Sequence, residues 1–322
     1  MYDYFMKKYL YQMFILGTGN LDSALSKGLG GVIFFQKDID TKEQFAGLIK
    51  SLNEKALIPP FMSIDQEGGR VERTKNIHPP YLSAKFAYEK GEEFLKEQTQ
   101  KISDELKSYG INLNFAPCAD VNTNPNNPII GERAFSDKVE DVIKGVKIVS
   151  DVYRKNGIVP CLKHFPGHGD TDKDSHVEMP IYNFSLSEAE KTHIRPFAEN
   201  IKDAEMVMVA HMYCPCFDKN KIIPASISKN VINYLRKNLN YENIVITDDM
   251  VMGGISGISP LEACVVGIDA GVNMFIFRNS DDKTLSMMED LLKTVEKSEF
   301  LKSKVMKSYE IITGIKRKYG IL

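Results

Sequence analysis

The sequence predicts an α/β protein built as a single-domain (β/α)8 TIM barrel, and three observations carry this prediction. Eight short apolar runs alternate with longer amphipathic stretches along the 322 residues. Most of these runs are continuously apolar, as is typical of strands buried on both faces of a parallel sheet. No Pro- or Ser-rich linker, low-complexity segment or change of composition divides the chain. We therefore expect one barrel domain over residues 1–322, with a doubly wound open sheet as the alternative.

The first expected strand needs an argument, because the residues before it resemble a signal peptide. Lys7 and Lys8 precede an apolar stretch, but Gln12 interrupts that stretch and no small-residue cleavage site follows. We therefore assign the segment YQMFILG to a buried strand. The eight expected strands cover residues 12–17, 31–35, 61–65, 113–117, 159–164, 206–212, 243–249 and 274–277.

Amphipathic stretches between the apolar runs predict the helices that surround the barrel. In residues 85–109, apolar side chains recur at helical spacing, and Gly110 follows as a candidate helix C-cap. A last amphipathic stretch closes the chain after the eighth strand. The remaining helices are expected at residues 41–53, 137–156, 187–201, 228–239, 260–270, 283–295 and 299–318.

The overall composition excludes several classes of protein. Hydrophobic residues make up 43% and charged residues 26%, which excludes a disordered chain, a collagen and a coiled coil. Lys and Arg number 41 against 43 Asp and Glu, so the chain has no basic excess for binding nucleic acid. No run of 18 apolar residues occurs, so we expect no membrane span.

The five cysteines indicate a reducing compartment. Their number is odd and their density is low, so we expect no disulfide framework and predict a cytoplasmic protein. Cys214 and Cys216 lie two positions apart, a spacing that fits neither a redox pair nor a zinc knuckle. We interpret them as small buried hydrophobic residues. We also expect the protein to be a monomer.

Polar residues of unusual types follow five of the expected strands. In barrel enzymes the chemistry lies just past the carboxyl ends of the strands, so this placement indicates a catalytic site. The third strand ends at Asp65, and the seventh ends at Asp248 and Asp249. We interpret the histidines outside these segments, His78 and His193, as ordinary surface or loop residues. The other polar residues at the strand ends are Asp120, Lys163, His164, His168, His176 and His211.

The loop KHFPGHGDTDKDSH, residues 163–176, is the densest of these polar segments. It holds three His, three Asp and two Gly. One interpretation is acid/base chemistry, in which Asp174 orients and polarises the imidazole of His176. The second interpretation is a metal site, and spacing alone does not decide between the two. The possible metal ligands are His164, His168, Asp170, Asp174 and His176.

The seventh strand supplies a candidate nucleophile, which favours the acid/base interpretation. Neighbouring side chains on a strand point to opposite faces, so one of Asp248 and Asp249 can face the barrel mouth as a nucleophile. The other can cap a helix or pair with an arginine, and the alternative is that both cap the next helix. A carboxylate with a separate acid/base group is typical of retaining glycosidases. Arg73 and Arg133 can bind substrate oxygens bidentately, and Lys163 can bind them as a point charge.

These segments belong to a longer set of sequence blocks that resembles family 3 glycoside hydrolases, specifically the single-domain bacterial β-N-acetylglucosaminidases. Seven blocks occur in the same order over most of the chain, which makes the resemblance highly specific. A lone GGR or DD would carry no such information. The blocks are YQMFILG, GGVIFF, SIDQEGGRVERT, NFAPCADVNTNPNNPIIGERAF, KHFPGHGDTDKDSH, MVMVAHM and VITDDMVMGGI.

The resemblance implies a role for each matching residue. Asp248, the first Asp of the TDD segment, matches the catalytic nucleophile; His176 matches the general acid/base, and Asp174 matches the partner of that histidine. His211 matches a residue that lines the pocket. Larger family members with β-glucosidase activity supply the acid from a second domain, which the DSH segment replaces here. The residues that match the −1 subsite for N-acetylglucosamine are Asp65, Arg73, Arg133, Lys163 and His164.

The activity that the resemblance implies is that of a retaining exo-β-N-acetylglucosaminidase with a covalent glycosyl-enzyme and no metal or organic cofactor. The expected substrates are small saccharides from peptidoglycan, as in cell-wall recycling, with chitin oligosaccharides as the rival. The absence of Trp disfavours a long stacked chitin-binding cleft. A phosphorylase of the same family is a second candidate, because neutral histidine does not repel phosphate as a glutamate anion does. A metal-dependent barrel hydrolase and a non-catalytic sugar-binding barrel are two further candidates.

Two segments depart from the usual family pattern. Asn273 stands where family members commonly carry Asp, and Gln36 with Lys37 stands where an Arg-Asn pair is common. Both departures lie away from the expected nucleophile. We therefore expect them to affect fine specificity and to leave the chemistry unchanged.

Overall fold

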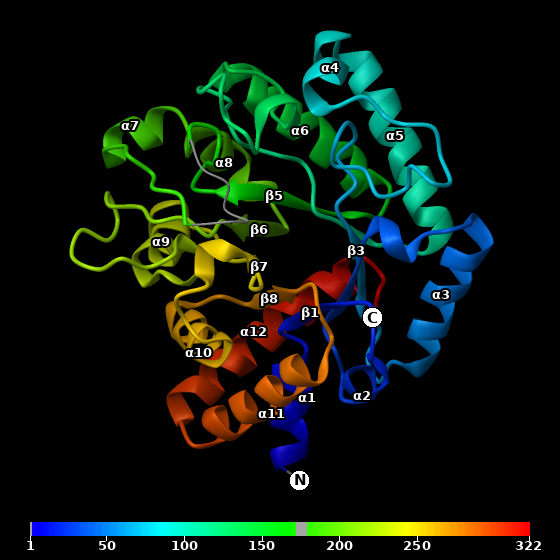
Figure 1. Cartoon of the computed structure of the whole chain (residues 1–322), viewed down its shortest axis with the longest axis vertical. Coiled ribbons are helices and arrows are strands. Elements are labelled where there is room, and N and C mark those ends of the chain that lie inside the picture. Colours follow the sequence, from blue (N-terminus) through cyan, green and yellow to red (C-terminus); the bar gives the residue numbers. More distant parts are fainter. Residues whose placement is uncertain (1, 172–178) are drawn as a thin grey trace.

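The protein folds into a closed barrel of eight parallel strands, which follow one another around the barrel in chain order (Figure 1). The computed structural model describes residues 2–171 and 179–322. All eight expected strands are present, so the predicted (β/α)8 barrel is confirmed. The strands are β1 (Phe14–Gly17), β2 (Gly31–Phe34), β3 (Phe61–Ile64), β4 (Leu113–Asn114), β5 (Val159–Phe165), β6 (Met206–Val209), β7 (Ile244–Asp249) and β8 (Met274–Phe277).

Strand pairing closes the barrel between its first and last strands. Phe14 of β1 pairs in parallel with Phe275 of β8, while Ile15 of β1 pairs with Gly31 of β2 on the other side. Every residue of β1, β2, β3 and β8 is buried. One face of each strand meets the barrel interior and the other meets a helix, which explains why the apolar runs are continuous.

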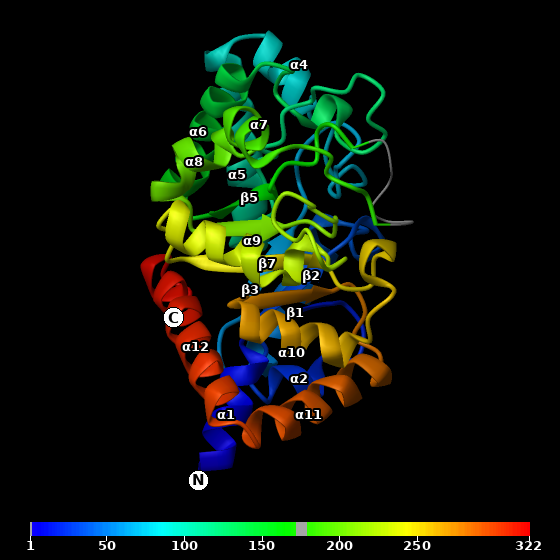
Figure 2. The same cartoon turned by 90° about the vertical axis from the view of Figure 1, so that its left-hand side faces the viewer.

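Helices cover the outside of the barrel between successive strands (Figures 1 and 2). The helices are α1 (Tyr2–Tyr11), α2 (Asp22–Leu25), α3 (Lys42–Lys55), α4 (Ala84–Glu89), α5 (Glu92–Tyr109), α6 (Val139–Lys155), α7 (Leu186–Lys191), α8 (Arg195–Asn200), α9 (Lys229–Asn233) with a π-helical continuation (Tyr234–Asn238), α10 (Pro260–Ala270), α11 (Asp282–Glu296) and α12 (Glu299–Lys318). Each long helix buries an apolar face against the strands, as α3 does with Phe45, Ile49 and Leu52.

Two of the expected helices are divided in the structure. The stretch 85–109 forms α4 and α5, because Gly91 between them adopts a φ of 101° that interrupts the helical path. Gly110 ends α5 with a φ of 93°, which confirms the predicted C-cap. The stretch 187–201 forms α7 and α8, and Pro196 lies in the first turn of α8, where it starts a new helix.

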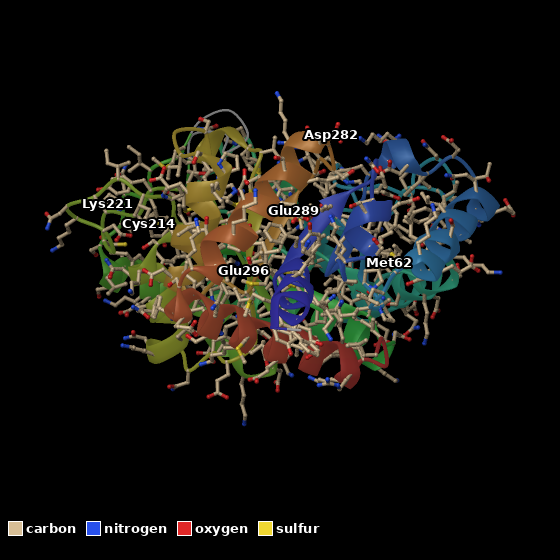
Figure 3. All side chains as sticks on the ribbon, turned by 90° about the horizontal axis from the view of Figure 1, so that it is seen from below. Met62, Cys214, Lys221, Asp282, Glu289 and Glu296 are labelled. Atoms are coloured by element: carbon tan, nitrogen blue, oxygen red, sulfur yellow. The ribbon has the colours of Figure 1, made fainter. Side chains whose placement is uncertain are left out.

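Helix α1 occupies residues for which the sequence predicts no element. It packs against α11 and α12 on the outside of the barrel (Figure 3). The Tyr11 hydroxyl donates a 2.7 Å hydrogen bond to the carboxylate of Glu289 on α11, which also forms an ion pair with Lys27 at 2.9 Å. Tertiary contacts of this kind stabilise a helix that its local sequence does not mark. In the described part of the chain, no helix has both the length and the apolar character needed to cross a bilayer.

Helix α12 covers the amino-terminal end of the barrel. The fully buried Nζ of Lys316 donates to Oε1 of Gln12 at 2.8 Å and to the carbonyl oxygen of Pro59 at 2.9 Å. Gln12 and Pro59 lie just before β1 and β3, so one side chain joins the last helix to two strands. Burial lowers the pKa of Lys316 well below its usual value. The long loops after β3, β4 and β6, together with the described residues after β5, lie at the opposite end.

Asn273 and Gln36, which depart from the family pattern, form hydrogen bonds that join segments of the fold. Oδ1 of Asn273, just before β8, accepts hydrogen bonds from Nη2 of Arg236 at 2.6 Å and from the backbone amide of Val245 at 2.9 Å. It therefore joins neighbouring strands at the amino-terminal end, remote from the polar strand ends. Gln36 lies in a turn after β2 and donates to Oδ1 of Asn76 at 3.0 Å.

Candidate active site

A cavity of about 320 Å³ opens at the carboxyl ends of the strands. Its volume lies in the range of small-molecule sites. Apolar side chains of three strands, Ile33, Met208 and Ile276, form part of its lining. The structure also brings together at this cavity six residues that the sequence predicts for the site. These residues are Asp65, Arg73, Arg133, Lys163, His164 and Asp248.

Strand β7 carries two carboxylates with different surroundings. Asp248 lines the cavity, and its Oδ1 accepts a hydrogen bond from the backbone amide of Asp249 at 2.8 Å. Oδ2 of Asp249 lies 2.6 Å from Nε of Arg278, and its Oδ1 accepts the backbone amide of Val251 at 3.1 Å. Burial raises the pKa of Asp249. Asp249 also lines the cavity, so the two carboxylates differ in their partners rather than in facing opposite sides: Asp249 is the one paired with an arginine.

Three segments converge on a buried ion network at one side of the cavity. Nζ of Lys163 on β5 lies 2.7 Å from Oδ1 of Asp65 and 2.6 Å from Oε1 of Glu67. Arg133 donates from Nε and Nη2 to the two carboxylate oxygens of Glu67, at 2.8 Å each. Burial alone would raise the pKa of Glu67, but the two cations hold it well below its usual range. Glu67 therefore fixes both cations in place by charge-assisted hydrogen bonds.

Arg73 extends this network toward solvent. Its Nη2 lies 4.0 Å from Oδ2 of Asp65, and its guanidinium carbon lies 5.9 Å from the ring centre of Phe35. The backbone amide of Arg73 donates to Oε1 of the buried Gln66 at 2.8 Å, which holds the loop after β3 against the barrel. The three cations predicted to bind substrate oxygens therefore lie around the carboxylates of Asp65 and Glu67. These cations are Arg73, Arg133 and Lys163.

We expect Glu67→Gln to lower the free energy of unfolding by about 3–5 kcal/mol, because it leaves Lys163 and Arg133 buried without their shared carboxylate. Chemical denaturation at neutral pH measures this loss. Glu54→Gln is the matched control, because Glu54 forms an exposed surface pair with Lys50 at 4.0 Å. Its expected effect is below about 1 kcal/mol.

The pH dependence of this loss tests its electrostatic cause. The pKa of Glu67 is lower in the folded protein than in the unfolded chain, so its stabilising effect is complete at neutral pH and is lost as the pH falls. The stability difference between the wild type and Glu67→Gln should therefore shrink below about pH 4.3, the ordinary glutamate pKa. A difference that stays constant on acidification would contradict the ion-pair account.

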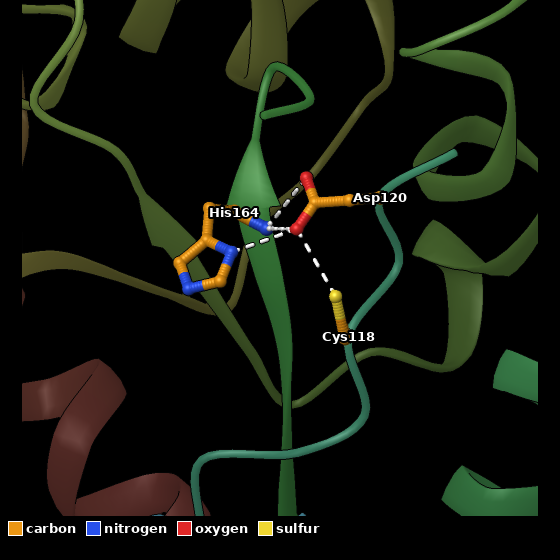
Figure 4. A group of neighbouring side chains, drawn as sticks. All are labelled: Cys118, Asp120 and His164. Carbon is orange, nitrogen blue, oxygen red and sulfur yellow. Dashed lines mark hydrogen bonds and ion pairs between the residues drawn. The ribbon is translucent and has the colours of Figure 1, made fainter. Parts of the chain in front are cut away.

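His164 is oriented by Asp120 (Figure 4). Nδ1 of His164 lies 2.7 Å from Oδ2 of Asp120, and its Nε2 lies 3.3 Å from Nη2 of Arg133. Because a guanidinium can only donate, Nε2 accepts, and Nδ1 carries the proton that it donates to Asp120. Asp120 is fully buried and also accepts the backbone amide of His168 at 2.6 Å. It thereby fixes the imidazole that lines the cavity.

The same cluster contains donor atoms of the kinds that bind metals. The ligand atoms of Cys118, Asp120 and His164 lie within 4.8 Å of one another (Figure 4). Burial raises the pKa of the Cys118 thiol well above its usual value, and Sγ donates to Oδ2 of Asp120 at 3.1 Å. The Arg133 guanidinium beside His164 would repel a cation. This donor set therefore fits a hydrogen-bonded cluster better than a thiolate metal site.

The loop after β5 contains the remaining residues of the acid/base and metal interpretations. Asp174 and His176 lie outside the described residues, so their roles stay predictions. His168 lines the cavity, and burial lowers its pKa to about 4, so it is neutral at physiological pH. The Oγ1 of Thr171 lies 2.6 Å from Nδ1 of His168.

Two other histidines are more deeply buried than the sequence predicts. His211 is fully buried and is not among the described residues that line the cavity. Its Nε2 donates to the carbonyl oxygen of Asp249 at 3.0 Å, and its Nδ1 lies 2.7 Å from Oγ of Ser226, so it supports the end of β7 from behind. His193 lies in the turn after α7, which fits the expected loop position, but it is fully buried and not at the surface. Gly167 makes room for it, since a Cβ there would lie 2.6 Å from Cβ of His193.

Three residues at the site have no role predicted from the sequence. Glu67 and Asp120 lie within the blocks SIDQEGGRVERT and NFAPCADVNTNPNNPIIGERAF, close behind the expected strand ends. The rule that identified Asp65 therefore applies to both. Arg278 directly follows β8 and satisfies the same rule, and the polar residues Asn279, Ser280, Asp281 and Asp282 follow it in the sequence.

Comparison with known proteins identifies the family to which this chain is similar. Residues 20–315 match the family model described as the glycosyl hydrolase family 3 N terminal domain. The beta-hexosaminidase A of Pseudoalteromonas piscicida is 34% identical over 269 residues, which cover 76% of this chain and 45% of that protein. The beta-hexosaminidase of Tolumonas auensis is 31% identical over 271 residues, which cover 82% of this chain and 79% of that protein.

A solved structure shares the whole architecture. The family 3 beta-N-acetylglucosaminidase from Paenibacillus sp. str. FPU-7 superposes with a TM-score of 0.91 at 30% identity, covering 98% of this chain and 62% of that chain. The chain thus spans less than two thirds of the length of the Paenibacillus enzyme and of the Pseudoalteromonas relative. The matched residues 20–315 include all the cavity residues from Asp65 to Arg278. The chain therefore belongs to glycosyl hydrolase family 3.

Proposed function

We propose that this chain is a retaining exo-β-N-acetylglucosaminidase. The observation that carries the proposal is the position of Asp248, at the end of β7 in a cavity whose wall holds the fixed ions Lys163 and Asp65 and the oriented His164. A carboxylate that faces fixed donors and acceptors suits a sugar ring, whose hydroxyls need such partners. The relatives named beta-hexosaminidases support an N-acetylhexosamine as the sugar.

The shape of the cavity supports attack on a terminal sugar. Its volume of about 320 Å³ is small, and apolar side chains of the barrel strands contribute to its lining. A pocket of this kind accommodates one sugar ring and leaves the rest of the saccharide toward the loops. An open cleft would be needed to cleave within a long polymer.

In the proposed mechanism, a carboxylate oxygen of Asp248 bonds to the anomeric carbon as the bond to the leaving oxygen breaks. His176, oriented by Asp174, donates its proton to that oxygen, and a covalent glycosyl-enzyme of inverted configuration forms. Neutral His176 then takes a proton from water, whose oxygen attacks the anomeric carbon. The ester bond to Asp248 breaks and the β configuration returns. The roles of His176 and Asp174 rest on the DSH segment of the sequence.

The proposed substrates are peptidoglycan fragments in which N-acetylglucosamine is linked to a muramic acid, with chitin oligosaccharides as the rival. The cytoplasm is the proposed compartment, and the five free cysteines support it. A hydrolysis panel of a muropeptide, chitobiose and aryl glycosides separates these substrates.

We expect an aryl N-acetylglucosaminide to be cleaved with a kcat/KM at least about 100-fold higher than that of the matching aryl glucoside. A pocket that binds the acetamido group leaves polar partners unpaired when that group is missing. Steady-state kinetics with both glycosides measures the ratio. Equal values would show that the pocket does not recognise the acetamido group, and no turnover of either would favour a binding protein.

A further inference from the structure

Strand β8 places a cation in the cavity that the proposed mechanism does not use. The strand is apolar and fully buried, and Arg278 follows it directly. The guanidinium side chain is 40% exposed and lines the same cavity as Asp248. The side chains of Lys163 and Arg133, by contrast, are only 2% and 9% exposed. Arg278 is therefore accessible to a ligand in a way that these two cations are not.

Asp249 holds Arg278 along one edge. Oδ2 of Asp249 lies 2.6 Å from Nε, and Oδ1 accepts the backbone amide of Arg278 at 3.2 Å. Among the residues that the structure describes, the two terminal nitrogens of Arg278 have no acceptor. Those of Arg133 are occupied, since Nη2 donates to Glu67 and Nη1 donates to the carbonyl oxygen of Ile129 at 3.2 Å. Arg278 thus combines a fixed position with unused donors.

A guanidinium that is held in place and has two unused terminal nitrogens is suited to bind an oxyanion. Its two terminal N–H groups form paired hydrogen bonds with a carboxylate or a phosphate, and a neutral sugar hydroxyl cannot use both. Asp65 and Glu67 pair with Lys163 and Arg133, and Asp249 likewise pairs with Arg278, so the unused terminal nitrogens of Arg278 are what distinguish it from the other two cations. An anion that approaches Asp248 would be repelled by its carboxylate unless a further cation stood there.

We propose that Arg278 forms a subsite for an oxyanion next to the scissile bond. This inference rests on the proposed function. Two sources share the chemistry, namely a carboxylate carried by the leaving group and free inorganic phosphate acting in place of water. In the phosphate case, an oxygen of the hydrogen phosphate dianion bonds to the anomeric carbon as the ester bond to Asp248 breaks. The carboxylate recovers the electron pair, and the proton stays on the sugar phosphate.

Two variants and one control test the subsite in the full chain. Arg278→Gln removes the charge, and Arg278→Lys keeps the charge but loses the paired N–H groups. Lys221→Gln is the matched control, because Lys221 is an exposed cation in the loop after β6 that does not line the cavity. Melting temperatures of all three identify any loss of folding before kinetics are compared.

The carboxylate arm compares N-acetylglucosaminyl-β-1,4-N-acetylmuramic acid with its methyl ester, which differ in one charge. We expect the wild type and Lys221→Gln to prefer the acid in kcat/KM by about 10- to 100-fold, the usual effect of a charge-assisted hydrogen bond. Arg278→Gln should lower this ratio to about one, and Arg278→Lys should give an intermediate ratio.

The phosphate arm uses an aryl N-acetylglucosaminide with inorganic phosphate, against chloride at equal ionic strength. Mass spectrometry detects N-acetylglucosamine 1-phosphate, which should form with the wild type and be lost with Arg278→Gln if phosphate is the ligand. An Arg278→Gln enzyme with an unchanged acid-to-ester ratio and an unchanged phosphate response would overturn the subsite. Failure of the wild type to cleave the neutral aryl glycoside would instead overturn the proposed function.

Discussion

Asp248→Ala should lower kcat for an aryl N-acetylglucosaminide by at least about 10⁴-fold, on the order seen when a catalytic nucleophile is removed. Without this carboxylate, Asp249 is the carboxylate that remains at the end of β7, and its ion pair with Arg278 makes it the weaker nucleophile. Steady-state kinetics and a melting curve separate lost chemistry from lost folding. Asp249→Asn should cost less activity, since that carboxylate positions its neighbours.

Chemical trapping identifies the nucleophile independently of mutation. A 5-fluoro N-acetylglucosaminyl substrate should accumulate as a covalent adduct, and peptide mass spectrometry should locate it on Asp248. An inactive Asp249→Asn together with an active Asp248→Ala would show that the neighbouring carboxylate is the nucleophile. An adduct on any other residue would require a different mechanism.

His176→Ala should slow the cleavage of a disaccharide or alkyl glycoside by about 10²–10⁴-fold and affect a nitrophenyl glycoside much less in its first step. A poor leaving oxygen needs the proton that the imidazole donates, whereas an acidic phenol leaves without it. The same residue activates water in the second step, so the variant should accumulate glycosyl-enzyme on the activated substrate. Pre-steady-state measurements should therefore show a burst of nitrophenol.

Asp174→Ala provides the graded comparison for this prediction. It should produce a milder form of the same pattern, because Asp174 only orients and polarises the imidazole of His176. A His176→Ala enzyme that is slowed equally on both classes of leaving group, without a burst, would mean that His176 binds substrate and that another residue donates the proton.

The strands were predictable because they are buried on two faces and most of them are therefore apolar along most of their length. The division between α4 and α5 was not, since the helical spacing of apolar residues continues across Gly91 and only its φ of 101° breaks the helix. Helix α1 depends on partners such as Glu289, which follow it by more than two hundred residues. Contacts between such distant segments leave no local signal in the sequence.

The site residues likewise include some that the sequence could predict and some that depend on contacts between distant segments. Asp65, Lys163 and Asp248 could be predicted because they end apolar strands and the barrel brings all strand ends together. The role of Glu67 could not, because it depends on Lys163 and Arg133 arriving from two other segments at under 3 Å. The burial of His193 likewise depends on the space left by Gly167.

Because β1 pairs with β8, the barrel cannot close on the ribosome until most of the chain has been made. At about 5–20 residues per second, the roughly 260 residues between Phe14 and Phe275 take about 13–52 s to synthesise. During that time one edge of β1 is unpaired, and the exposed edge of an apolar strand invites aggregation. Helix α12, whose Lys316 joins Gln12 to Pro59, emerges later still. The nascent protein therefore relies on shielding of its first strands, by chaperones or by transient local contacts, until its last strand is available.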